Sequence, residues 1–89
     1  MKLSSYTQYY NLALRTAESL LVSANQNIQE TYEEELHEFH TLSPYVRTET
    51  EHGKDLYDEM TLLMGISKTL SGCINSLRMI LPKKEAPNG

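Results

Sequence analysis

The amino-acid sequence predicts an all-α protein, a helical hairpin of two long antiparallel helices that dimerisation or partner docking completes as a four-helix bundle. From residue 6 onward, apolar residues recur three and four positions apart, which is the spacing of one helix face. No segment of useful length alternates with the period of two that a half-buried strand needs. With 89 residues the chain has the size of one domain, which we place at residues 1–81, followed by a disordered tail at 82–89.

The first helix is expected over about residues 5–41. Ser4 or Ser5 can cap its start, because a serine hydroxyl there accepts a hydrogen bond from a free N–H group of the first turn. A second seam of Tyr6, Ala13 and Leu20 lies beside the main apolar stripe. The stripe itself consists of Tyr10, Leu14, Ala17, Leu21, Ala24, Ile28, Tyr32, Leu36 and Phe39.

The break between the two helices is expected at Thr41–Pro44. Proline disfavours helix at the residue before it, Ser43, and is itself well suited to the first position of the next helix. An alternative start is Thr48–Glu51, where Thr48 and Glu51 have the spacing of a capping box. Residues 44–48 are then either a loop or the first turn.

The second helix is expected over about residues 44–81, because Pro82 ends it. Its stripe follows a heptad rhythm that only Ser67 interrupts, and Ile66, Cys73 and Ile80 run alongside. At about 1.5 Å per residue, two helices of about 35 residues make a hairpin roughly 50 Å long. The stripe consists of Leu56, Met60, Leu63, Ser67, Leu70, Ile74, Leu77 and Leu81.

Each predicted helix carries about three apolar positions per heptad, whereas contact with one neighbouring helix covers two. The remaining apolar surface predicts that a second copy or a partner protein completes a four-helix bundle. In the alternative, the tail or a kinked segment folds back to make a three-helix monomer.

Gly65 and Gly72 lie seven residues apart in the second helix, and each costs about 1 kcal/mol relative to alanine in a helix interior. Close approach of another backbone would explain them, and we expect Ala13, Ala17 and Ala24 to be the opposing surface. Cys73, the single cysteine, lies on the apolar face and is interpreted as a small core residue.

A break near Gly65 would give Met60–Asn75 the form of a helix-turn-helix and make the protein a weak DNA-binding regulator. Phosphate contacts supply most of the affinity for DNA, and only Lys68 would project a cation from the recognition helix. The net charge of −4 also argues against a nucleic-acid partner. The unbroken heptad favours a continuous helix instead.

Acidic and basic residues are unevenly distributed along the chain. Residues 30–59 hold ten acids and two bases, whereas residues 60–89 hold one acid and four bases. The end of the hairpin near Pro44 is therefore acidic, and the opposite end is weakly basic. Glu33, Glu34 and Glu35 either form a solvated face or speed docking on a basic partner.

Glu34 with His37, and Glu49 with His52, have the Glu-x-x-His spacing of carboxylate-bridged di-metal bundles. A hairpin centred on Pro44 would bring the two pairs near each other, with His40 close by. This makes a metal-binding helical bundle an alternative function, although the surrounding glutamates favour a water-exposed acidic end.

The sequence contains no nucleophile elbow, Gly-rich phosphate loop, paired-cysteine motif or Ser/His/Asp order, so we expect neither an enzyme nor a cofactor. A small interaction module that acts as an adaptor, chaperone-like subunit or inhibitor is the leading prediction, with a homodimer or another protein as its partner. The start lacks an apolar segment and there is one cysteine, so we expect no membrane span and a cytoplasmic location. Affinity is expected from Leu63, Ile66, Leu70, Ile74, Leu77 and Ile80.

Tyr6, Tyr9 and Tyr10 gather near the start of the chain. They either cover the base of the hairpin or anchor a partner, because tyrosine buries its ring while its hydroxyl stays in water.

Overall fold

The computed structural model describes residues 4–81, and the predicted disordered tail at 82–89 lies outside them. This described part contains four helices, α1 (Ser5–Tyr9), α2 (Asn11–Thr41), α3 (Pro44–Glu49) and α4 (Glu51–Ile80). Within residues 4–81 there is no strand, so the all-α prediction is confirmed. None of the helices in this part of the chain is long and apolar enough to cross a membrane.

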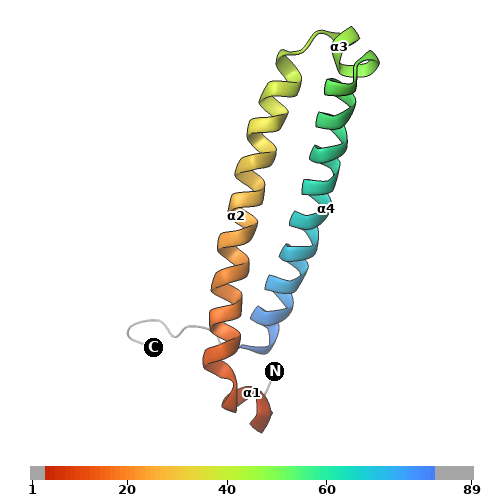
Figure 1. Ribbon diagram of the computed structural model, residues 1–89. Helices are drawn as coiled ribbons and strands as arrows, with labels where there is room; N and C mark the ends of the chain where they lie inside the picture. Colours follow the sequence, from red (N-terminus) through yellow and green to blue (C-terminus); the bar gives the residue numbers. More distant parts are fainter. Residues whose placement is uncertain (1–3, 82–89) are drawn as a thin grey trace.

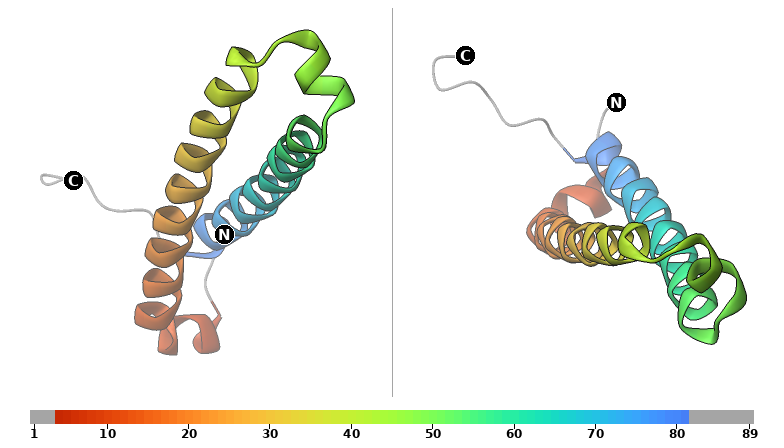
Figure 2. Two further views of the ribbon diagram at one scale, coloured as in Figure 1. Left: turned by 45° about the horizontal axis from the view of Figure 1, so that its top comes forward. Right: turned by 90° about the horizontal axis from the view of Figure 1, so that it is seen from above.

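The two long helices, α2 and α4, lie side by side and run in opposite directions (Figures 1 and 2). Helix α3 joins them at one end of the hairpin, which we call the tip, and α1 turns away at the other end, the base (Figure 1). The predicted hairpin is thus confirmed, with a longest dimension of 57 Å. The structure has one copy of the chain, so the bundle that completes it remains a prediction.

The first predicted helix, 5–41, is interrupted at Tyr10, which separates α1 from α2. Ser4 caps α1 as expected, because its hydroxyl accepts a hydrogen bond from the Thr7 N–H at 3.2 Å. The Tyr9 and Tyr10 rings meet edge to face at the bend, with centroids 4.9 Å apart. Periodicity did not indicate this bend, since apolar residues continue across it.

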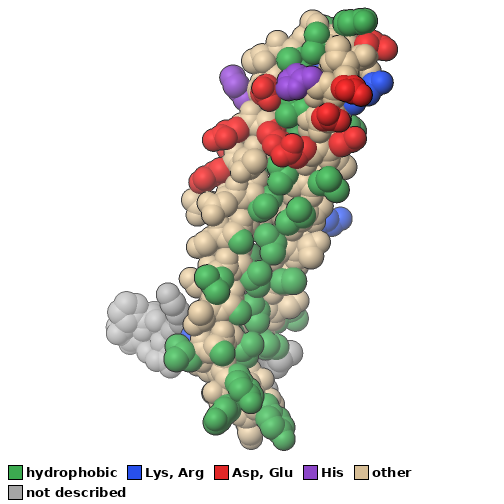
Figure 3. Space-filling view, in the orientation of Figure 1, with side chains coloured by type: hydrophobic (Ala, Val, Ile, Leu, Met, Phe, Trp, Pro, Cys, Tyr) green, Lys and Arg blue, Asp and Glu red, His purple; other side chains and the backbone are tan. Residues whose placement is uncertain are grey.

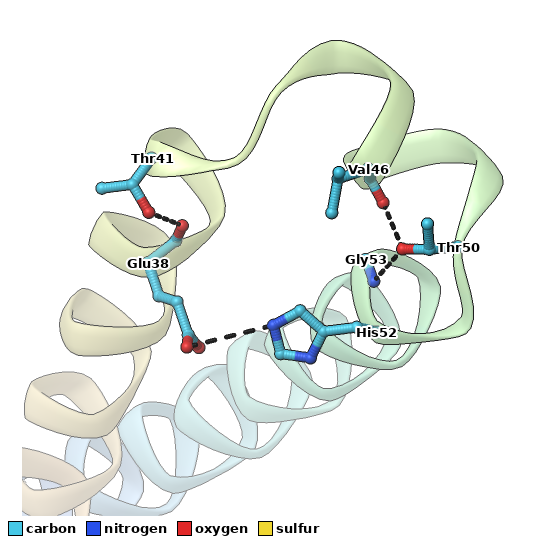
Figure 4. A network of polar contacts seen from close by, with 6 residues as sticks. All are labelled: Glu38, Thr41, Val46, Thr50, His52 and Gly53. Atoms are coloured by element: carbon cyan, nitrogen blue, oxygen red, sulfur yellow. Dashed lines mark hydrogen bonds and ion pairs between the residues drawn. The ribbon is translucent and has the colours of Figure 1, made fainter.

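The second predicted helix, 44–81, is also divided in two. Pro44 begins α3 as expected, and Ser43 caps it, but Thr50 is extended and ends it. Thr50 then caps α4, its hydroxyl accepting from the Gly53 N–H at 3.2 Å and donating to the Val46 carbonyl at 2.6 Å (Figure 4). The alternative capping box of Thr48 and Glu51 is therefore wrong: the Thr48 hydroxyl donates to the Pro44 carbonyl.

Gly53 is the glycine at which two backbones approach closely. A Cβ atom placed there would meet the carbonyl oxygen of Val46 and lie 2.5 Å from that of Arg47. Glycine at this position lets α3 fold back onto the first turn of α4, as the close view of the tip shows (Figure 4). Gly53 is also buried.

Arg47 fastens α3 to the end of α2. Its guanidinium donates to the Phe39 carbonyl at 3.0 Å and to the His40 carbonyl at 2.8 Å. These carbonyls belong to the last turn of α2, where helical partners are missing and a positive charge is favoured. The same guanidinium lies 5.5 Å from the centre of the Phe39 ring.

The buried apolar core lies between α2 and α4, on the predicted stripe of the second helix. Leu56, Met60, Ile74 and Leu81 are its buried members, all at 7% exposure or less. On the first helix the predicted stripe is half-buried, except that Tyr10 and Ala24 are exposed. The second seam of Tyr6, Ala13 and Leu20 is wrong as a packing surface, because all three are exposed.

A polar layer crosses the middle of the contact between α2 and α4. Ser67 donates to the Asn25 side-chain oxygen at 2.7 Å, and the Asn25 amide donates to Ser71 at 3.2 Å. Gln29 also donates to Ser67, at 3.4 Å. Asn25 thus occupies the contact position that the sequence pattern assigned to Ala24.

Candidate functional site

The six apolar residues predicted to bind a partner lie on two different faces of α4. Ile74 is 6% exposed in the core, and Leu63, Leu70 and Leu77 are half-buried on the same stripe. Ile66 is 46% exposed and flanks that stripe, as does half-buried Ile80. Of the six, Ile66 offers the most surface to another molecule, and partner binding by all six remains a prediction.

A further set of side chains lies on the side of α4 that faces away from α2, which we call the outer face. Its members recur at steps of three and four, so they occupy one broad stripe of the helix. Leu62 and Met79, near its two ends, are each 67% exposed. The outer face consists of Leu62, Gly65, Ile66, Thr69, Gly72, Cys73, Ser76, Met79 and Ile80.

Gly65 and Gly72 leave open space on the outer face. A Cβ atom at either glycine would meet nothing within 4 Å, so the expected approach of Ala13, Ala17 and Ala24 is wrong. The physical reason is rotational: α4 turns its stripe of Leu56, Met60 and Ile74 toward α2, which carries both glycines to the opposite side. Nothing within residues 4–81 covers either glycine.

A groove of about 460 Å³ runs over Gly65, and we call it the outer groove. Four of its lining residues are Leu62, Gly65, Ile66 and Thr69, which have the i, i+3, i+4, i+7 spacing of the hole that receives a side chain in helix packing. Thr61 and Leu70 complete the lining.

The hydroxyls of the outer face already have hydrogen-bond partners. Thr69 donates to the Gly65 carbonyl at 3.0 Å, and Ser76 donates to the Gly72 carbonyl at 3.0 Å. A buried hydroxyl without an acceptor costs free energy, so these bonds lower the cost of covering the face. Cys73 is exposed rather than in the core, and its thiol is free. The outer face can therefore be covered by an apolar surface without leaving these donors unpaired.

Acidic side chains gather at the tip, whereas hydrophobic side chains run along the hairpin and collect at the base (Figure 3). Glu33 and Glu34 are exposed there, as predicted for a solvated acidic surface. His52 lies 4.0 Å from the Glu38 carboxylate across the hairpin (Figure 4). The structure thus brings the ends of the two long helices together near the position expected from Pro44.

Glu35 differs from its acidic neighbours because it turns toward α4. Its Oε2 atom is shielded from solvent and has no donor among the described residues. Burial raises the pKa of this carboxyl, and a hydrogen bond with Glu59 and the charges of Glu59 and Glu38 raise it further. Two carboxyl groups form such a bond only when one is protonated, so Glu35 holds a proton more readily than an ordinary glutamate.

The residues of the metal alternative are not assembled into one site. Glu34 and His37 line an open depression with Glu30 and Glu33, while Glu49 ends α3 and His52 pairs with Glu38. Within residues 4–81, no group of three or more His, Cys, Asp or Glu side chains is placed to hold a metal ion.

The helix-turn-helix alternative requires a turn near Gly65, but α4 continues from Glu51 to Ile80 without a break. Met60–Asn75 is therefore a single helical segment. At the base, Tyr6 and Tyr9 are 80% and 81% exposed, so they do not cover the hairpin there.

Sequence reasoning missed the outer face as a unit, because it assigned Gly65, Gly72 and Cys73 to internal contacts. The missed signal is the second heptad rhythm of α4, in which Leu62, Ile66, Thr69 and Cys73 advance by four, three and four.

Comparison of the chain with protein-family models, with curated proteins and with solved structures gave no match. The fold and the surfaces described above are therefore the basis for its function.

Proposed function

We propose that the protein is a non-enzymatic protein–protein interaction module that packs the outer face of α4 against helices of another chain. The observation that carries this proposal is the unfilled groove over Gly65, on a helix whose other side is already packed against α2. Two glycines in the interior of a 30-residue helix cost about 1 kcal/mol each. Close approach of another helix offsets that cost.

Docking of this kind completes a four-helix bundle, whether the second pair of helices comes from another copy or from a different protein. Covering apolar side chains contributes about 25 cal/mol for each Å² removed from water, so Leu62, Ile66 and Met79 supply affinity. Adaptor, chaperone-like subunit and inhibitor are all roles for such a module. A cytoplasmic location belongs to the proposal, since an exposed free thiol at Cys73 suits a reducing compartment.

The acidic tip has a separate role in this proposal. Exposed charges are screened over about 8 Å at physiological salt, so Glu33 and Glu34 chiefly change the rate of encounter with a basic surface. Neutralising Glu33, Glu34 and Glu35 together is expected to slow association and flatten its salt dependence. Dissociation is expected to change little.

Site-specific photo-cross-linking in cells that produce the protein tests the proposed face. A photoreactive amino acid is placed at Leu62 or at Ile66, and the matched control position is Met64. Met64 is 57% exposed but lies on the other flank of α4, beside Gln29 and Tyr32. We expect protein adducts from the first two positions and few from Met64. Equal yields at all three positions, or no adducts at Leu62 and Ile66, would contradict the proposal.

A further inference from the structure

We propose that the occupant of the outer groove is a second copy of this chain, packed antiparallel so that the two α4 helices cross between Leu70 and Ser71. This inference rests on the proposed function and names the partner of the same face. Three observations carry it: three pairs of symmetrically placed positions on the outer face, the size of the side chains at its centre, and the distribution of charge along the hairpin.

Three pairs of positions on the outer face lie symmetrically about the midpoint of residues 70 and 71, whereas Ile66, Cys73 and Ile80 have no counterpart on that face. Leu62 and Met79 are large, exposed and equally distant from the midpoint of residues 70 and 71. Gly65 and Ser76 are likewise equidistant from it, and so are Thr69 and Gly72. In a two-fold symmetric contact residue i meets residue j and residue j meets residue i, so the members of each pair would face each other across the crossing.

The side chains near this midpoint are small, which permits two helix backbones to approach. A Cβ atom at Gly65 or Gly72 would meet nothing within the hairpin, so this space is free for the second copy. The hydroxyls of Thr69 and Ser76 are bonded to their own helix and leave no donor unpaired when covered. Leu62 of one copy would then meet Met79 of the other on each side of the crossing.

Charge selects the antiparallel orientation. Residues 30–59, which include the tip and the adjoining turns of α2 and α4, carry a net charge of −8, with ten acids and two bases. The part of α4 after Met60 contains Lys68 and Arg78 but no acid, and Arg78 already forms an ion pair with Glu18 of α2, at 2.8 Å. A parallel pair would bring two acidic tips together. An antiparallel pair places each acidic tip beside the more basic part of its partner.

The experiment uses two cysteine variants of the full chain, each in a Cys73→Ser background. One carries Leu62→Cys and the other carries Met79→Cys, and both positions are 67% exposed, so neither change disturbs the core. The two positions are seventeen residues apart, which is about 25 Å along a helix and beyond the reach of a short bis-maleimide. The variants are purified, treated separately and as a mixture, and the cross-linked dimers are quantified.

We expect the mixture to give at least about fivefold more cross-linked dimer than either variant by itself, and light scattering to report a dimer. The dissociation constant is expected to rise several-fold between about 50 mM and 500 mM salt, because the attraction between tip and base is screened. A Met64→Cys variant in the same background is the control, and we expect it to cross-link with neither partner. Circular dichroism confirms that each variant remains helical.

Efficient cross-linking of each variant with itself would overturn the antiparallel arrangement, since identical residues meet in a parallel pair. A chain that stays monomeric at about 100 µM would overturn the second copy as the occupant. In that case, cellular photo-adducts from Leu62 to a different protein leave the proposed function standing. If those adducts are also missing, the proposed function fails as well.

Discussion

Ser67 donates a hydrogen bond of 2.7 Å to Asn25 in the middle of the contact between α2 and α4, although the two residues are 42 positions apart. Together with Ser71 and Gln29, they form a polar layer across the middle of this contact. Polar groups in such a contact specify how two helices align, because a shift along the helix leaves them unpaired. The register of the hairpin is thus marked by these side chains.

The polar layer predicts a stability cost for losing Asn25. Asn25→Ala removes partners of Ser67 and Ser71, and we expect it to lower the free energy of unfolding by about 1–3 kcal/mol. Urea-induced unfolding followed by circular dichroism measures the change. Asn27→Ala, at an exposed position of the same helix, is the control and is expected to change stability by less than about 0.5 kcal/mol. Equal effects of the two changes would contradict a role for the layer.

The contacts of Arg47 predict that this residue stabilises the tip. Arg47→Met keeps much of the side-chain volume but removes both hydrogen bonds to the end of α2. Hydrogen bonds from charged groups contribute about 1.5–3 kcal/mol, so we expect a loss of that size in the unfolding free energy. Lys54→Met removes an exposed cation from the same end of the molecule and serves as the control. If both variants melt at the wild-type temperature, Arg47 does not fasten α3 in solution.

Replacing each of two glycines of α4 with alanine is expected to change the stability of the protein in opposite directions. At Gly53, the new methyl group would collide with the Val46 and Arg47 carbonyls, so Gly53→Ala should destabilise the protein by about 1–3 kcal/mol. At Gly65 the space is open, so Gly65→Ala should stabilise the isolated chain by about 1 kcal/mol through helix propensity. Urea unfolding at a concentration where the chain is monomeric measures both. The same sign at both positions would contradict the placement of α3 against Gly53.

Glu35 predicts a dependence of stability on pH. Because burial raises its pKa in the folded state, the protonated form is favoured by folding. The contribution of Glu35 to stability is fully present at pH values below the pKa of glutamate in the unfolded chain. It is lost as the pH rises through the higher pKa of the folded state. Glu35→Gln removes this titration, so the variant should gain stability relative to the wild type as the pH rises from about 4 to about 7.

Thermal unfolding across that pH range measures the effect at Glu35. Glu33→Gln removes the same charge from an exposed position of α2 and controls for the general loss of acidity at the tip. The difference between the two variants reports the combined effect of burial and of the contacts of Glu35 with Glu59 and Glu38. A constant difference across the range would mean that the Glu35 carboxyl is not shielded in solution.

Much of the architecture followed from local chemistry. The serines before the first helix predicted its cap at Ser4 or Ser5, and Pro44 predicted where the next helix begins, because both depend on neighbouring residues only. The heptad rhythm of the second helix predicted that Leu56, Met60 and Ile74 share a buried face. Local patterns did not indicate the break at Tyr10, since helical residues continue on both sides of it, and the capping-box pattern placed the start near Thr50 at Thr48 instead.

The sequence by itself determined that this chain is helical, where its main turn lies and that its tip is acidic, since these depend on periodicity, proline and charge along the chain. Only the tertiary structure decided which face each helix presents to the other. Periodicity defines the faces of a helix but not their rotation about its axis, and α4 has apolar residues on more than one face. Packing placed Asn25 rather than Ala24 in the contact, and it left Gly65 and Gly72 on the open side of α4, where the proposed partner packs.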